Sequence, residues 1–154
     1  MIEINEKAED FTLDGIDEEG NEKEFSLSDF EGKNVVLFFY PMDNTPGCTI
    51  EASDFSNIFH PLNKDVVVIG ISRDDIDSHK KFQDNYDLEF ILLSDPESKV
   101  HEEYGVIEAT DLEHKKMIRS TFLIDKSGIV RNIWKEVDVN GHAEEVMKAL
   151  KELA

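Results

Sequence analysis

Two apolar runs stand out in the first half of the chain. Residues 35–40 read Val-Val-Leu-Phe-Phe-Tyr and residues 66–71 read Val-Val-Val-Ile-Gly-Ile, with no charged side chain in either run. Such runs are typical of strands that are buried on both faces, as in a parallel sheet. The segment between them predicts a helix from about Pro46 to Ile58, closed by His60-Pro61, because a residue before a proline resists the helical conformation. The three segments together predict a right-handed β-α-β crossover.

Shorter segments on either side of this crossover carry weaker patterns. Residues 11–27 predict a β-hairpin with a polar tip, and residues 28–33 predict a short turn or a single helical turn. After the crossover, a helix is expected over 74–86, with an inner face made of Ile76, Phe82 and Tyr86.

The second half of the chain predicts a different arrangement. We expect a short strand at 90–93, a short helix over 98–104 that ends at Gly105, and a hairpin over 120–134. A closing helix begins after Asn140-Gly141, since apolar residues recur on one face at Ala143, Val146, Met147, Leu150 and Leu153.

The order of these elements predicts an α/β protein with a central mixed sheet flanked by helices. This is a thioredoxin-like layout with an N-terminal β-hairpin extension. The 154 residues are enough for one hydrophobic core, so a single domain over 1–154 is expected.

The chain is strongly acidic, with 35 Asp and Glu against 16 Lys and Arg and a formal net charge of -19. An acidic surface repels phosphate backbones and anionic lipid, so nucleic-acid binding and membrane docking are not expected. A small neutral substrate would be insensitive to this charge.

The cysteine count is one, which excludes an intramolecular disulfide and suits a reducing compartment. The N-terminal residues have no basic region followed by an apolar stretch, so no signal peptide is expected. No apolar run approaches the length of a membrane span. We therefore expect a cytoplasmic protein.

That single cysteine lies at a predicted helix start. Thr45 suits the N-cap, Pro46 the first helical position and Gly47 the second, which puts Cys48 at the third. The unpaired N–H groups and the positive end of the helix dipole favour a thiolate there. Because Cys48 also lies on the buried stripe of its helix, an inert core cysteine is an alternative with about even weight. The position of Cys48 at the helix start favours a reactive thiolate over an inert core cysteine.

A resemblance to a known family bears on this choice. The pattern Pro41-x-x-x-Thr45-x-x-Cys48 resembles the active-site signature of the peroxiredoxins. The longer run over 39–55 is similar to the peroxiredoxin Q subfamily, also called bacterioferritin-comigratory proteins, and residues 119–125 resemble the second block of that subfamily.

The resemblance implies a thiol-dependent peroxidase that reduces hydrogen peroxide and organic hydroperoxides. Cys48 would be the peroxidatic cysteine, whose thiolate attacks the terminal peroxide oxygen and becomes a sulfenic acid. Thr45 would hydrogen-bond the sulfur and the peroxide. Arg119 would stabilise the thiolate and the charge on the departing oxygen. From the residues alone, a strand arginine in a surface ion pair would be the favoured interpretation of Arg119, and the resemblance changes it.

The same resemblance gives three supporting residues. Pro41 would shield the sulfur from water, and the N–H groups of Gly47 and Cys48 would complete the anion site. Glu51 would organise the arginine, with an ordinary exposed helix carboxylate as the alternative.

One position departs from the family pattern. Many members carry a resolving cysteine five residues after the peroxidatic one, where this chain has Ser53. The sequence therefore predicts a one-cysteine enzyme that needs an external thiol reductant, either a thioredoxin-like protein or a low-molecular-weight thiol. Whether Ser53 is native or replaces a cysteine is left open.

Two other functions are considered: a redox sensor or stress-binding protein switched by oxidation of Cys48, and an inert scaffold. No cofactor or metal is expected, because the single His142 and Glu145 pair at helical spacing is more typical of a solvated face. We expect a monomer or a weak homodimer.

Overall fold

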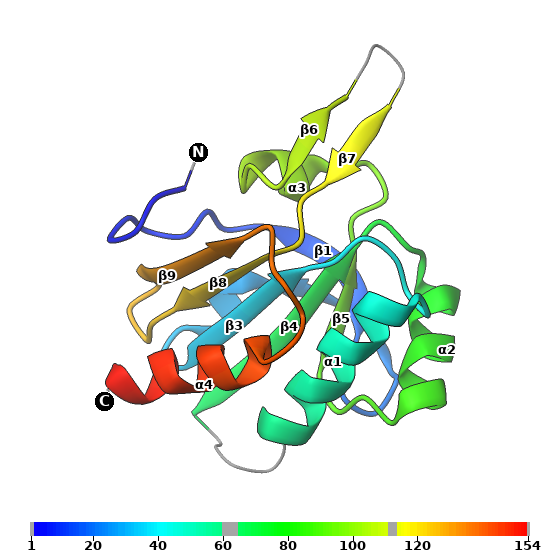
Figure 1. The fold of residues 1–154 in the computed structure, drawn as a ribbon, viewed down its shortest axis with the longest axis horizontal. Helices are drawn as coiled ribbons and strands as arrows, with labels where there is room; N and C mark the ends of the chain where they lie inside the picture. The colour runs from blue at the N-terminus through cyan, green and yellow to red at the C-terminus, as the bar shows by residue number, and fades with distance from the viewer. Residues whose placement is uncertain (1, 60–64, 111–113, 154) are drawn as a thin grey trace.

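A computed structural model describes residues 2–59, 65–110 and 114–153, and its centre is a seven-stranded mixed sheet (Figure 1). The strand order is β2-β1-β5-β4-β3-β8-β9. The strands are β1 (Thr12–Ile16), β2 (Glu22–Ser26), β3 (Asn34–Phe39), β4 (Val66–Ser72), β5 (Ile91–Ser94), β8 (Ser120–Ile124) and β9 (Val130–Lys135).

The two apolar runs form the middle of this sheet, as predicted. β3 and β4 are parallel, with Asn34 paired to Val66 and Phe39 paired to Ile71. β5 continues the parallel part, and β8 joins the other edge of β3 in the antiparallel direction. The N-terminal hairpin of β1 and β2 is confirmed, and it extends the sheet because β1 pairs with β5.

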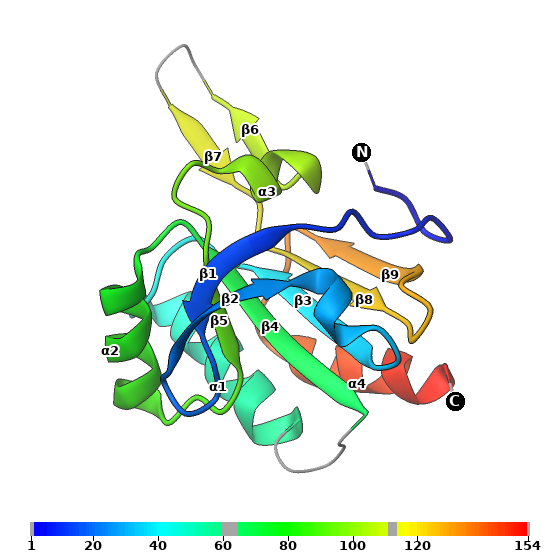
Figure 2. The same ribbon diagram turned by 180° about the vertical axis from the view of Figure 1, so that it is seen from behind.

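Helices cover both faces of the sheet. The helices α1 (Pro46–Phe59), α2 (Ile76–Tyr86) and α4 (His142–Glu152) lie on one face, over a core that includes Phe38, Phe55 and Phe82 (Figure 1). The short α3 (Lys99–Glu103) and the 3-10 helix η1 (Leu27–Phe30) lie on the other face (Figure 2). The α/β, thioredoxin-like prediction is confirmed.

Several local predictions need correction. Tyr86, the last residue of α2, is 40% exposed and is not on the inner face of the helix. His79 is buried on that face, although the apolar pattern did not include it. α2 begins at Ile76, where the Asp75 side chain accepts the Ser78 N–H. The hairpin of β6 (Ile107–Ala109) and β7 (Lys115–Met117) was not predicted, since both strands are short and polar.

The predicted helix stop at His60-Pro61 lies outside the described residues. Among the helices that are described, none has the length and apolar character needed to cross a bilayer.

Candidate active site

The candidate site lies where β3 ends and α1 begins. A loop over residues 40–45 joins them, and Thr45 precedes the first helical residue, Pro46. The Thr45 carbonyl accepts the Thr49 N–H at 2.8 Å, which is the first bond of the helix. The Thr45 hydroxyl donates to the Met42 carbonyl at 2.8 Å. The Thr45 hydroxyl hydrogen therefore forms a bond within the loop over residues 40–45 and is not directed at the Cys48 sulfur.

Cys48 lies in the first turn of α1 and is 1% exposed. Arg119 immediately precedes β8, 71 positions after Cys48, and its Nη2 donates to the Cys48 Sγ at 3.2 Å. Its Nη1 donates to the Glu51 Oε1 at 2.7 Å. The structure thus brings together the three residues Cys48, Glu51 and Arg119, as the resemblance implied.

The charges of this triad are set by burial. Glu51 is 1% exposed, so the alternative of an exposed helix carboxylate is wrong. Burial raises the pKa of Glu51 to about 7, although the nearby Arg119 acts in the opposite direction. Burial also tends to lower the pKa of Arg119, but ion pairing with Glu51 and the approach of Cys48 outweigh it, and the pKa is raised overall. Arg119 therefore remains a cation facing the sulfur.

The small size of Gly47 allows this close approach. A Cβ at Gly47 would lie 3.3 Å from the Arg119 Nη2, which is tighter than an ordinary carbon contact. Pro41 is exposed at the start of the loop, and Ser53 is half-buried further along α1.

Sequence reasoning missed the polar interior on both sides of the sulfur. Within the described residues, the Thr49 Oγ1 and the Glu51 Oε2 are buried with no hydrogen-bond partner. On the other side of the loop, Asp43 is 6% exposed and is bonded to the buried His79. Burial of these polar groups depends on contacts between distant segments, so no local pattern signals it.

The larger cavities lie elsewhere. One of about 880 Å³ is lined at the far end of α1 by Ile58 and Phe59, and by residues of α4. Another of about 440 Å³ is lined by Trp134, His142 and the loop between β9 and α4. Cys48 lines neither of these two cavities, and its side chain is buried.

His142 is 3% exposed, so the expected solvated face is wrong for this residue, and both of its ring nitrogens have ordinary hydrogen-bond partners. The His142 Nε2 lies 2.7 Å from the Thr121 Oγ1, and its Nδ1 lies 3.1 Å from the Glu145 Oε1. In the described part of the chain, no three His, Cys, Asp or Glu side chains are placed to hold a metal ion.

Comparison with known proteins places this geometry in a family. The sequence model of the AhpC/TSA family matches residues 4–133. A bcp-type peroxiredoxin of Coxiella burnetii is 44% identical over 97% of this chain and 99% of that protein. The protein named peroxiredoxin Bcp of Bacillus subtilis is 41% identical over 99% of this chain and 98% of that one.

Solved structures agree with the sequences. A PrxQ variant of Xylella fastidiosa superposes with a TM-score of 0.89 at 32% identity, covering 99% of this chain and 97% of that chain. The chain therefore belongs to the AhpC/TSA family, within the Bcp and peroxiredoxin Q group of thiol peroxidases.

Proposed function

We propose that this thiol peroxidase reduces hydrogen peroxide and organic hydroperoxides at Cys48. The thiolate attacks the terminal oxygen of the peroxide and forms an S–O bond while the O–O bond breaks. The departing oxygen takes up a proton and leaves as water or an alcohol, and Cys48 is left as a sulfenic acid. The observation that carries the proposal is the 3.2 Å contact between the Arg119 Nη2 and the sulfur.

Arg119 acts through its fixed position. Its Nη1 is held by Glu51, so the second nitrogen faces the sulfur without a further change of side-chain conformation. A donor that is already oriented in a poorly solvated site stabilises developing negative charge more strongly than water does. The cation would thus stabilise both the thiolate and the departing oxygen.

The loop residues are assigned supporting roles. The N–H groups of Gly47 and Cys48, in the first turn of α1, would bind the peroxide oxygens. The Thr45 hydroxyl would turn from the Met42 carbonyl to the peroxide when substrate enters. Pro41 would limit the access of water.

The return of Cys48 to its reduced state requires an outside thiol, because the sequence contains one cysteine. One thiol would condense with the sulfenic acid to give a mixed disulfide and water, and a second would release Cys48 by exchange. A reducing, cytoplasmic setting and a monomer or weak homodimer fit this chemistry.

The test is steady-state consumption of hydrogen peroxide with a thiol donor, supplied either as thioredoxin with its reductase or as a small thiol. Many turnovers per chain are expected with at least one donor. A single oxidation per chain with every donor would contradict turnover and would favour a redox sensor.

A further inference from the structure

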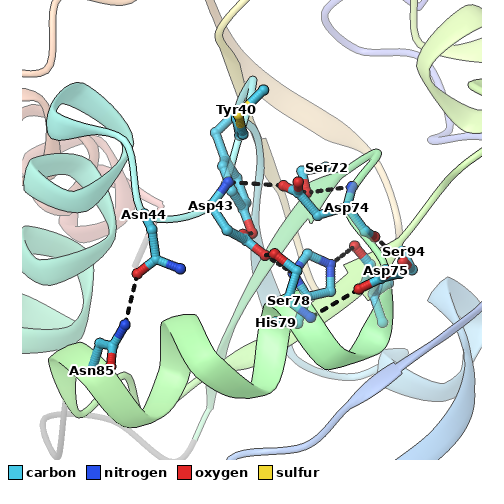
Figure 3. A network of polar contacts seen from close by, with 12 residues as sticks. Tyr40, Asp43, Asn44, Ser72, Asp74, Asp75, Ser78, His79, Asn85 and Ser94 are labelled. Atoms are coloured by element: carbon cyan, nitrogen blue, oxygen red, sulfur yellow. Dashed lines mark hydrogen bonds and ion pairs between the residues drawn. The ribbon is translucent and has the colours of Figure 1, made fainter.

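A fully buried histidine joins α2 to the loop that precedes Cys48. His79 is 0% exposed, and its Nδ1 lies 2.7 Å from the Asp43 Oδ2 (Figure 3). Its Nε2 lies 2.9 Å from the Leu93 carbonyl oxygen. One side chain thereby connects the active-site loop, α2 and β5.

The Asp43 and His79 pair has further hydrogen-bond partners in the protein interior. The Leu93 carbonyl can only accept, so the His79 Nε2 must donate to it. The Asp43 carboxyl also accepts from the Tyr40 hydroxyl at 2.5 Å and from the Ser78 hydroxyl at 2.8 Å. Burial, followed by the charge of Asp43, raises the pKa of Tyr40, which keeps its hydroxyl as a donor. The Asp43 carboxyl group is thus held by the Tyr40 and Ser78 hydroxyls and by its contact with the His79 ring, so all of these contacts fix its position.

The same loop is held at two further points. The Asp43 backbone N–H donates to the Asp74 Oδ2 at 2.8 Å, and the Ser72 hydroxyl donates to the same oxygen at 2.7 Å. The next residue, Asn44, has a φ of 61° and accepts from the Asn85 side chain at 3.0 Å (Figure 3). A left-handed conformation in a residue other than glycine persists only when surrounding contacts support it.

We propose that His79 is a positioning residue for the chemistry of Cys48. It orients Asp43, and Asp43 holds the loop over residues 40–45 in the conformation that starts α1 at Pro46. This inference rests on the peroxidase function proposed above, although its effect on Cys48 can be measured without peroxide.

The physical reason is the sensitivity of a preorganised site to position. Cys48 faces Arg119 only while the first turn of α1 is in place, and the loop is the connection through which that turn is fixed. Loss of His79 would leave the buried Asp43 carboxyl group without its histidine partner, which favours opening of the loop toward water. A misplacement of about 1 Å in a reacting group lowers a rate on the order of 100-fold.

The experiment compares the His79→Leu variant with the wild type and with a matched control. The control is His101→Leu, because His101 is also 0% exposed and lies 2.6 Å from an aspartate, Asp95. That pair lies in the core on the opposite face of the sheet, against Phe39. Both substitutions leave a buried aspartate without its histidine, so both should lower the free energy of unfolding.

Three quantities are measured on folded protein: the rate of Cys48 oxidation by hydrogen peroxide, the rate of Cys48 alkylation by iodoacetamide, and amide hydrogen exchange over residues 43–49. His79→Leu should lower the peroxide rate on the order of 100-fold, while alkylation and exchange become faster because the buried sulfur is exposed more often. His101→Leu should leave all three near wild type. A purely structural role of His79 would not move the two Cys48 rates in opposite directions.

A milder variant covers the case in which His79→Leu does not fold. Ser78→Ala removes one donor from Asp43 and should shift the same three quantities in the same directions by less. Unchanged Cys48 rates in the folded variants, or equal changes in His101→Leu, would overturn the proposal. If the wild type itself did not react with peroxide, the proposed function would fail, and alkylation and exchange alone would decide whether His79 positions the loop.

Discussion

The two ends of helix α1 differ in what they bury. The N-terminal end buries Cys48 and Glu51 beside Arg119. The C-terminal end carries Ile58 and Phe59 next to a cavity of about 880 Å³. Cys48 is therefore buried at the N-terminal end of α1, whereas the cavity lies at the C-terminal end and is lined partly by apolar side chains.

This difference shows that volume does not locate the chemistry in this protein. A hydroperoxide group is small, so it needs oriented charge more than space. Poor solvation strengthens the interaction of Arg119 with nearby charge, whereas the ion pairs at the cavity end are solvated and worth less.

The largest effect is expected from Arg119→Met. Removal of the cation should lower the rate of Cys48 oxidation by peroxide on the order of 100-fold or more, because an oriented donor to the developing charge is lost. Stopped-flow kinetics with hydrogen peroxide measures this rate. The matched control is Arg131→Met, since Arg131 pairs with Asp125 at 2.7 Å at the cavity end and should leave the rate unchanged. Equal losses of oxidation rate in both variants would contradict a specific role of Arg119 at the sulfur.

A smaller effect with a distinct pH dependence is expected from Glu51→Gln. Because the pKa of Glu51 is about 7, the carboxylate that holds Arg119 forms as the pH rises through 7. Glutamine can still accept one hydrogen bond, but it lacks the charge. The rate of Cys48 oxidation by hydrogen peroxide should be nearly equal in the wild type and the variant at low pH. Above pH 8 the wild type should react roughly tenfold faster. A ratio that is independent of pH would assign Glu51 a purely steric role.

The same substitution should change how stability depends on pH. The unfolded chain releases the Glu51 proton near pH 4.5, whereas the folded chain releases it near 7. Between these values the unfolded state binds fewer protons, so the wild type loses stability as the pH rises, by up to about 3 kcal/mol. Urea unfolding at pH 4.5 and pH 8 should show a smaller loss in Glu51→Gln. An equal loss in both proteins would contradict the raised pKa.

Ser53→Cys tests whether the N-terminal half of α1 can open. Five residues of helix rise about 7.5 Å, and disulfides rarely form when the Cα atoms are more than about 7 Å apart. Peroxide should therefore produce a disulfide with Cys48 only together with a loss of helical signal in circular dichroism. The initial attack on peroxide should stay close to the wild-type rate. A stable sulfenic acid with no disulfide would show that the helix start does not open.

The smallest effect on catalysis is expected at the cavity end. Ile58 lines the cavity and is partly buried against the core, so Ile58→Ala should lower the free energy of unfolding by about 1–2 kcal/mol. The rate of Cys48 oxidation should not change. A large loss of rate with normal folding would show that the two ends of the helix are coupled.

Most of the fold could be predicted from the sequence because its central elements have strong local patterns. The apolar runs of β3 and β4 and the stripe of α4 each indicate their own structure and burial. The β6 and β7 hairpin has no such pattern, and Tyr86 looked internal only because its spacing matched that of Phe82.

The candidate site was predictable where residues near one another in sequence carry the signature, as with Cys48. Arg119 could be assigned only through the family resemblance, since no local property brings it to a sulfur 71 positions away. The burial of Asp43 with His79 was not predictable, because it is created by the packing of α2 against the loop. Polar pairs between residues far apart in the chain produce no periodic pattern in the sequence.

The most direct test of the central claim is intact-mass analysis after brief exposure to hydrogen peroxide with a dimedone-type trap for sulfenic acid. We expect one adduct per chain, mapped to Cys48, formed much faster than with a free thiol, and absent from Cys48→Ser. Reaction of the wild type no faster than a free thiol would contradict it.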